Sequence, residues 1–250
     1  MRIAVAGATG TLGRLVVEAV RTAGHDAVPL SRGSGIDLMT GSGLADALSG
    51  ASAVIDASST NSTSAKESIS FFGTVTRHLL AAERAAAVPH HVAISIIGAA
   101  EADTGYYAGK AVQEEILRAQ GSGWSVLRAA QFHEFAAQLL CHGRIGPLQV
   151  APAMRSQPIA AAEVAGELVE IAGGEPRGFA PTSRVRARSA WSTWSGAISR
   201  RPDSADRSSR CRSRAPGTEH AGRHAASRAR RTPRPAGFHR LARHADRMSR

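Results

Sequence analysis

The stretch Gly7-Ala8-Thr9-Gly10-Thr11-Leu12-Gly13 lies between two segments of different periodicity. Before it, the short apolar run 2–6 is typical of a strand that is buried on both faces. After it, apolar residues within 12–20 follow the spacing of a helix. A glycine motif in this strand–loop–helix context predicts a dinucleotide-binding βαβ unit, whose loop holds a nicotinamide cofactor's pyrophosphate.

Each glycine of this loop has a physical reason to be there. Gly7 allows the tight turn off the strand, Gly10 lets the backbone approach the pyrophosphate, and Gly13 lets the helix pack closely on the strand. The helix N-terminus then presents free N–H groups and a partial positive charge to the phosphates. The alternative is a plain strand–turn–helix that is rich in glycine. The cofactor-binding residues expected in the loop are Gly7, Thr9, Gly10, Thr11, Leu12 and Gly13.

The end of the second expected strand bears on which cofactor binds. An NAD site usually has an Asp or Glu there, which accepts hydrogen bonds from the ribose hydroxyls. This chain has Ser31-Arg32 instead, and an arginine beside a hydroxyl suits a 2′-phosphate. The sequence therefore favours NADP, with NAD as the alternative cofactor and a solvated surface arginine as the alternative role. Asp37 is expected either to accept from the adenine amine or to cap the segment that follows it.

Strand-like and helical segments alternate along the first 174 residues. This alternation predicts a parallel, doubly wound α/β sheet with helices on both faces. The expected strands are 2–6, 26–30, 53–56, 91–97 and 124–128, and the expected helices are 12–24, 43–49, 66–87, 106–120, 132–140 and 160–172.

The composition of the chain changes near residue 176. Residues 177–250 contain 19 Arg, no Lys and four acidic residues, a net charge of +15, whereas residues 1–176 carry −4. The larger apolar residues (Val, Ile, Leu, Met, Phe, Trp, Tyr) number 49 in the first segment and 8 in the second. Only the first segment can bury an ordinary core, and the second has the composition of a disordered chain. We expect a domain over 1–174 with a small, incomplete C-terminal lobe, and a low-order basic tail over 175–250.

Several classes of protein are not favoured by this sequence. Cys141 and Cys211 provide neither a disulfide framework nor a metal-ligand spacing. His90-His91 does not predict a metal site either, because neighbouring strand residues point to opposite faces. No window approaches the roughly 18 apolar residues of a membrane span, and the start lacks a signal-peptide pattern. We expect a cytoplasmic protein with no metal and no membrane partner, and the pattern does not indicate an oligomeric state.

A set of segments in one register over about residues 1–174 is familiar as a whole: Val5–Gly10, Ser31-Arg32, Phe71-Phe72, Leu79–Arg84, His91–Ser95 and Leu127–Phe132. Together they resemble the atypical short-chain dehydrogenases, particularly the NmrA-like NAD(P)-binding group. The resemblance implies a Rossmann fold with a small C-terminal substrate lobe. It also implies one of two functions: reduction of a carbonyl or quinone-like small molecule, or redox sensing by a regulator that binds NADP without turnover.

Tyr106 and Lys110 fit the Y-x-x-x-K pattern of the wider superfamily. Residues four apart share a helix face, and an ammonium there favours the phenolate, so the tyrosine can pass a proton to or from a carbonyl or hydroxyl. The resemblance implies that Lys110 also holds the nicotinamide ribose and that Ser95 is the third catalytic member. Ser95 is only eleven residues before Tyr106, closer than in the main branch of the superfamily. The alternative is an amphipathic helix with a half-buried tyrosine and a solvated lysine.

Further polar residues follow the third and fifth expected strands. Open α/β sheets bind ligands at the carboxyl ends of their strands. The resemblance places Gln131 and Phe132 beside the nicotinamide ring, with His133 as a further polar candidate. Ser58, which follows the third strand, is expected either to contact the cofactor or to cap the next helix.

Three interpretations of the tail remain open. As a basic disordered arm it would bind nucleic acid through phosphates, and as a surplus linker it would have no partner. The third interpretation is out-of-frame translation. Nineteen arginines without a lysine are unusual for an arm selected for charge, and the composition of the tail is what GC-rich codons give out of frame.

A frame change near codon 176 makes a specific prediction about the gene. One of the other two reading frames downstream should encode amphipathic segments, because the missing strand and helix of the lobe would be restored there. Sequencing the gene across codon 176 and translating both frames checks this expectation. Two frames without such segments would contradict it.

Overall fold

The computed structural model describes residues 1–132 and 158–182 with their side chains, and the backbone of several short strands between residues 144 and 200. All of these lie in the compact unit Met1–Asp203. Among the residues described, no helix has both the length and the hydropathy that crossing a bilayer requires.

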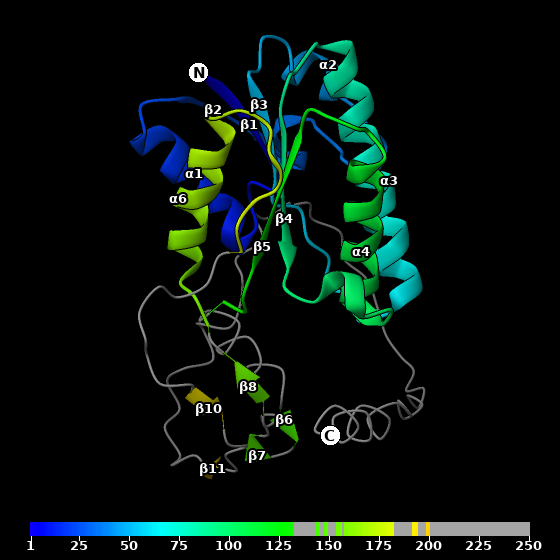
Figure 1. Cartoon of the computed structure of the whole chain (residues 1–250), viewed down its shortest axis with the longest axis vertical. Coiled ribbons are helices and arrows are strands. Elements are labelled where there is room, and N and C mark those ends of the chain that lie inside the picture. The colour runs from blue at the N-terminus through cyan, green and yellow to red at the C-terminus, as the bar shows by residue number, and fades with distance from the viewer. Residues whose placement is uncertain are drawn as a thin grey trace, which may run out of the picture. The chain divides into compact units, whose positions relative to one another are not determined.

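A six-stranded parallel sheet lies at the centre of this unit (Figure 1). The strands are β1 (Arg2–Ala6), β2 (Asp26–Leu30), β3 (Ala53–Asp56), β4 (His91–Ile96), β5 (Trp124–Ala129) and β9 (Gly178–Phe179). They are arranged in the order β2-β1-β3-β4-β5-β9, and each neighbouring pair is parallel. The chain therefore reverses its direction across the sheet between β2 and β3, which makes the gap between β1 and β3 a topological switch point. This is the Rossmann-type α/β fold that the alternating segments predict.

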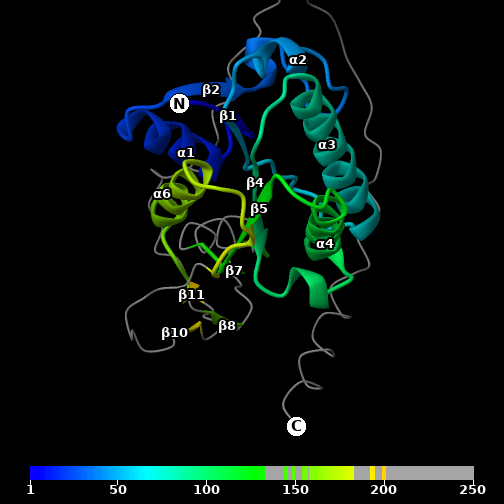
Figure 2. The ribbon, with the colours of Figure 1, turned by 45° about the horizontal axis from the view of Figure 1, so that its top comes forward.

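Helices cover both faces of the sheet (Figure 2). On one face α1 and α6 pack side by side, and on the other α3 packs along α4, with the short α2 beside α3. The bounds are α1 (Thr11–Thr22), α2 (Leu44–Ala47), α3 (Ala65–Ala85), α4 (Gly105–Arg118) and α6 (Ala161–Ala172). All five were expected from periodicity, with ends that differ by only a few residues.

Alternating side chains along the strands divide the core into two layers. Ile3 and Val5 of β1 pack with apolar residues of α1 and α6, whereas Ala4 and Ala6 pack with those of α2 and α3. Successive residues of a strand point to opposite faces, so a sheet covered on both sides has strands that are apolar throughout. The short apolar runs of the sequence are explained by this double burial.

The segment 175–250, expected as a low-order tail, begins with residues that belong to the sheet. Gly178–Phe179 forms β9, and the buried Ala180 that follows donates its N–H to Val126 O at 2.9 Å. Two further short strands lie beyond it: β10 (Ser192–Trp194) pairs with β8 (Met154–Ser156), and β11 (Ser199–Arg200) pairs with β7 (Leu148–Gln149), which also pairs with β6 (Arg144–Ile145). The expected helix 132–140 from residue 133 onward, and residues 201–250, lie outside the described residues.

Substitution of alanine for two helical glycines should have opposite effects on the stability of the fold. A Cβ on Gly13 would lie 2.0 Å from the carbonyl oxygen of Gly7, so Gly13→Ala must push α1 off β1 and should cost about 1–3 kcal/mol or more. Gly166 of α6 has nothing within 4 Å of its would-be Cβ, and Gly166→Ala should stabilise by about 0.5–1 kcal/mol. Urea unfolding of both variants measures the difference, and equal effects would contradict the close approach of α1 to β1.

Candidate dinucleotide site

The glycine loop leaves the sheet at the switch point between β1 and β3. Gly7 has a φ of 71°, and a Cβ there would lie 2.6 Å from the carbonyl oxygen of Ala57, so no side chain fits. Gly10 donates its N–H to Gly7 O at 2.9 Å and forms the extended N-cap of α1. No side chain caps this end of α1. The first amides of α1 are therefore free to donate to a phosphate group.

Ser58 lies against this loop, directly after β3. Its N–H donates to Asp56 Oδ1 at 2.9 Å, and its Cα would be 2.8 Å from a Cβ on Gly7. The Ser58 hydroxyl is buried and has no hydrogen-bond partner among the described residues. An unpaired buried hydroxyl costs about 1–3 kcal/mol, which a ligand atom that bonds it would recover. The glycine cradle, the uncapped helix and this hydroxyl fit a dinucleotide pyrophosphate.

The predicted 2′-phosphate residues lie at the end of β2. Ser31 and Ser34 form a capping box around a 3₁₀ turn at Arg32–Ser34. Arg32 is exposed, and its side chain has no ion pair or hydrogen bond with the residues described. Asp37 accepts the N–H of Met39 through Oδ1 at 2.8 Å, a contact that a cap of the following segment would make.

Tyr106 lies near the start of α4 and is largely enclosed. Its hydroxyl is hydrogen-bonded to Ser59 Oγ at 3.0 Å, and its ring packs edge-on against Phe72. Burial raises the pKa of Tyr106 to about 12, although the hydrogen bond with Ser59 lowers it. The expected lowering of this pKa by a neighbouring ammonium is therefore wrong, and the phenol stays protonated through neutral pH.

Lys110 is buried and does not bond to Tyr106. Its ammonium donates to Ile94 O and to Gln113 Oε1, both at 2.9 Å, and lies 4.2 Å from the centroid of the Phe72 ring. The alternative expectation of a solvated lysine is wrong for this side chain, and the catalytic role stays a prediction. Lys110 instead joins α4 to the carboxyl end of β4.

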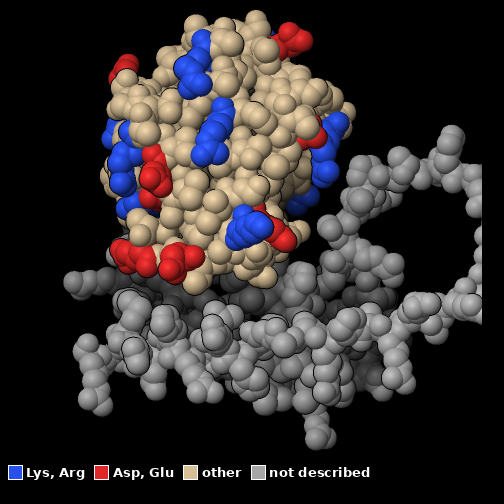
Figure 3. Space-filling model, turned by 90° about the vertical axis from the view of Figure 1, so that its right-hand side faces the viewer, with Lys and Arg blue, Asp and Glu red and all other residues tan. Residues whose placement is uncertain are grey.

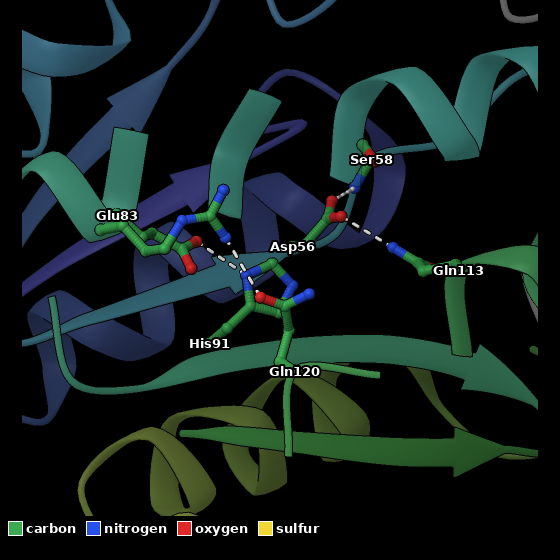
Figure 4. A network of polar contacts seen from close by, with 7 residues as sticks. Asp56, Ser58, Glu83, His91, Gln113 and Gln120 are labelled. Atoms are coloured by element: carbon green, nitrogen blue, oxygen red, sulfur yellow. Dashed lines mark hydrogen bonds and ion pairs between the residues drawn. The ribbon is translucent and has the colours of Figure 1, made fainter. Parts of the chain in front are cut away.

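Asp56 lies between Ser58 and Gln113 and is hydrogen-bonded to both, as Figure 4 shows. Gln113 accepts from Lys110 and donates through Nε2 to Asp56 Oδ2 at 2.7 Å, while Asp56 Oδ1 accepts from Ser58. A continuous polar chain thus runs from α4 through the end of β3 to the residue beside Gly7. Sequence reasoning missed Asp56 and Gln113, although an acid closing an apolar strand is a signal that could have identified Asp56.

Ser95, the third residue of the expected catalytic set, has a partner of its own. Its hydroxyl donates to Glu114 Oε1 at 2.6 Å, and the same carboxylate receives two hydrogen bonds from the guanidinium of Arg128. Tyr106, Lys110 and Ser95 are therefore each held by different groups, and no hydrogen bond in the described structure joins any two of them.

Gln131 and Phe132, which follow β5, contact different parts of the fold. Gln131 donates through Nε2 to the hydroxyl of Tyr107 at 3.2 Å. Phe132 forms a bridge with Ile159 and packs against the α1–α6 core layer. Tyr107 was set aside in the sequence because position 111 is not a lysine, yet it is the tyrosine that meets the expected nicotinamide-side loop. His133 lies outside the described residues.

The adjacent histidines have separate partners, as strand alternation predicts. His90 Nε2 is hydrogen-bonded to Ser125 Oγ at 2.8 Å, and His91 Nδ1 to Glu83 Oε1 at 2.7 Å. Within the described part of the chain, no group of three or more His, Cys, Asp or Glu side chains is placed to hold a metal ion.

No protein-family model and no curated protein matches the sequence. Solved structures of similar fold include the UDP-N-acetylglucosamine 4-epimerase from Bacillus cereus, at 22% identity and a TM-score of 0.55, which aligns over 73% of this chain and 76% of that one. The NADPH-dependent quinone oxidoreductase QOR2 from Escherichia coli was solved with NADPH. It is 23% identical, has a TM-score of 0.56, and aligns over 76% of this chain and 70% of its own. MoeE5, solved with UDP-glucose and NAD, is 18% identical and has a TM-score of 0.57. It aligns over 79% of this chain and 78% of its own. At these identities the likeness shows the shared Rossmann-type fold.

The burial of Lys110 predicts a pH-dependent stability. Burial lowers the pKa of Lys110 from 10.5 to about 8, although the charges of Asp56 and Glu114 raise it. Between those pH values the unfolded chain binds more protons at this group than the folded chain, so its contribution to stability increases as the pH rises. The free energy of unfolding of wild type, measured with urea from pH 7.5 to 9.5, should therefore increase relative to that of Lys110→Met. The exposed Lys66, the only other lysine, provides the matched control Lys66→Met, for which the difference from wild type should stay flat.

Proposed function

We propose that this chain is an NADP-dependent oxidoreductase of the atypical short-chain dehydrogenase type, with NmrA-like character, that reduces a quinone-like or carbonyl small molecule. The observation that carries the proposal is the cradle formed by Gly7, the uncapped start of α1 and the unpaired hydroxyl of Ser58. These features lie at the switch point, where open α/β sheets bind nucleotides. A bound nicotinamide supplies the hydride.

The preference for NADP depends on Ser31 and Arg32. Of the neighbours described above, QOR2 was solved with NADPH and MoeE5 with NAD, so they do not decide the cofactor. Arg32 is exposed and unpaired beside a serine-rich turn, where a 2′-phosphate would receive a charge-assisted hydrogen bond. An Asp or Glu, which would repel that phosphate, is absent from the end of β2.

The enclosed Tyr106 favours a quinone-like acceptor over a simple carbonyl. Hydride transfer to a carbonyl leaves an alkoxide, which needs a proton from an acid in the site. Tyr106 is hydrogen-bonded to Ser59 and makes no bond to Lys110, so the described residues assemble no proton relay behind its hydroxyl. Hydride transfer to a quinone leaves a phenolate, which water can protonate. The neighbour named as a quinone oxidoreductase supports the same acceptor class.

A redox sensor that binds NADP without turnover is the second candidate. The observation that favours it is the separate engagement of Lys110 and Ser95 in buried contacts, which leaves no assembled proton relay. Both candidates use the same cofactor site, and they differ only in whether the bound nucleotide reacts.

We assign no nucleic-acid role to the folded part of the chain. On the face that α3 and α4 present, acidic and basic side chains are interspersed among uncharged ones (Figure 3). Binding to phosphates along a strand of nucleic acid uses a continuous basic surface. Nucleic-acid binding through the basic tail would collapse with salt and would vanish on removal of residues 183–250, a truncation that leaves β9 in place.

NADPH oxidation with a panel of quinones and aldehydes or ketones tests the proposal. Wild type should bind NADPH and oxidise it with at least one quinone. Tyr106→Phe should retain quinone turnover within about threefold, because that step takes its proton from water. Tight NADPH binding without turnover on any acceptor would overturn the enzyme proposal in favour of the sensor. A loss of quinone turnover in Tyr106→Phe with NADPH binding intact would contradict the water-supplied proton.

A further inference from the structure

A hollow lies along the outer side of the glycine loop, between α1 and β2. It has a volume of about 470 Å³, and Thr9 of the loop, Arg14, Glu18 and Arg21 of α1, and Pro29 of β2 line it. Arg14 and Arg21 are both exposed, and neither makes an ion pair with Glu18. The hollow therefore presents two cationic side chains with one anionic side chain between them.

We propose that the loop end of this hollow, formed by Thr9 and Arg14, completes the binding site for the cofactor's 2′-phosphate together with Arg32. Arg14 is then a specificity-determining residue that selects NADP over NAD. This inference rests on the proposed function, since it assigns a further residue to the same dinucleotide site.

The register of the sheet places the hollow where the adenosine ribose would lie. Ala6 of β1 is paired with Leu30 of β2, so Gly7 and Ser31 leave the sheet at the same level. A dinucleotide whose pyrophosphate lies at the start of α1 directs its adenosine ribose toward the end of β2. Thr9 and Pro29 bound the space between those two points.

The position of Arg14 in α1 is unfavourable for the isolated helix. It lies at the end of the first turn, where the helix dipole disfavours a cation, and the first turn contains no acidic residue to balance it. The Arg14 side chain makes no hydrogen bond or ion pair with the residues described. A dianionic phosphate would supply the missing counter-charge, and the guanidinium fork suits phosphate oxygens.

Glu18 determines which end of the hollow a phosphate can occupy. It lies one turn beyond Arg14 and would repel an anion that entered deeper along α1. Arg21 lies seven residues from Arg14, about 10 Å further along the helix axis. A phosphate is therefore confined to the end formed by Thr9 and Arg14, and Arg21 provides a control with the same charge, on the same helix, in the same hollow.

Dissociation constants for NADPH and NADH, measured by nucleotide fluorescence on the full chain, test this assignment. Arg14→Gln should weaken NADPH binding about tenfold or more while NADH binding changes by less than twofold, because only NADPH carries the 2′-phosphate. Arg21→Gln should leave both constants within about twofold. Glu18→Gln should tighten NADPH binding and leave NADH binding unchanged, since it removes a repulsive charge. Thermal unfolding of Arg14→Gln should show no loss of stability, because a cation is removed from a helix start.

The outcomes separate the two proposals. If NADPH and NADH bind but Arg14→Gln weakens them equally or not at all, the assignment of Arg14 is overturned and the proposed function stands. An equal loss of NADPH affinity in Arg21→Gln would also overturn it, because the effect would then be one of net charge. If wild type binds neither nucleotide, the proposed function and this assignment both fail.

Discussion

The buried carboxylate of Asp56 is the constraint on which the rest of the site depends. Neither of its oxygens is left unpaired: one accepts the backbone N–H of Ser58, and the other accepts from Gln113. A buried charge is tolerated only when it is compensated, so α4 must hold Gln113 and the lysine behind it in a fixed register against β3. The same carboxylate fixes the turn that brings Ser58 against the glycine loop. One side chain therefore joins the packing of α4 to the shape of the cofactor cradle.

Most of the fold could be predicted from the sequence, because its information is local. Helices such as α1 and α3 bury one stripe of apolar residues, and strands such as β3 are short apolar runs, so each reveals itself within its own span. The sixth strand could not be found in this way. Gly178–Phe179 is too short for a periodicity, and its pairing with β5 comes from the topology of the whole sheet.

The candidate site likewise has one part that local sequence predicts and one part that depends on tertiary packing. The glycine loop is contiguous in the chain, so its geometry followed from the order of its residues. The Y-x-x-x-K spacing states only that Tyr106 and Lys110 share a face of α4, and it cannot say what that face meets. In the folded chain it meets Phe72 of α3 and the end of β4, which bury the lysine and enclose the tyrosine. Tertiary packing, which the spacing does not encode, therefore decided the protonation and partners of both side chains.

Pro29 has a consequence beyond the hollow that it lines. It lies within β2, which is an edge strand of the sheet and offers its outer backbone groups to any chain that approaches. A proline lacks the N–H that a further strand would need, and it interrupts the ladder near its middle. The opposite edge, β9, is only two residues long. Both margins of the sheet are therefore poor templates for another strand, which limits edge-to-edge association of folded chains and protects the sheet against growth into aggregates.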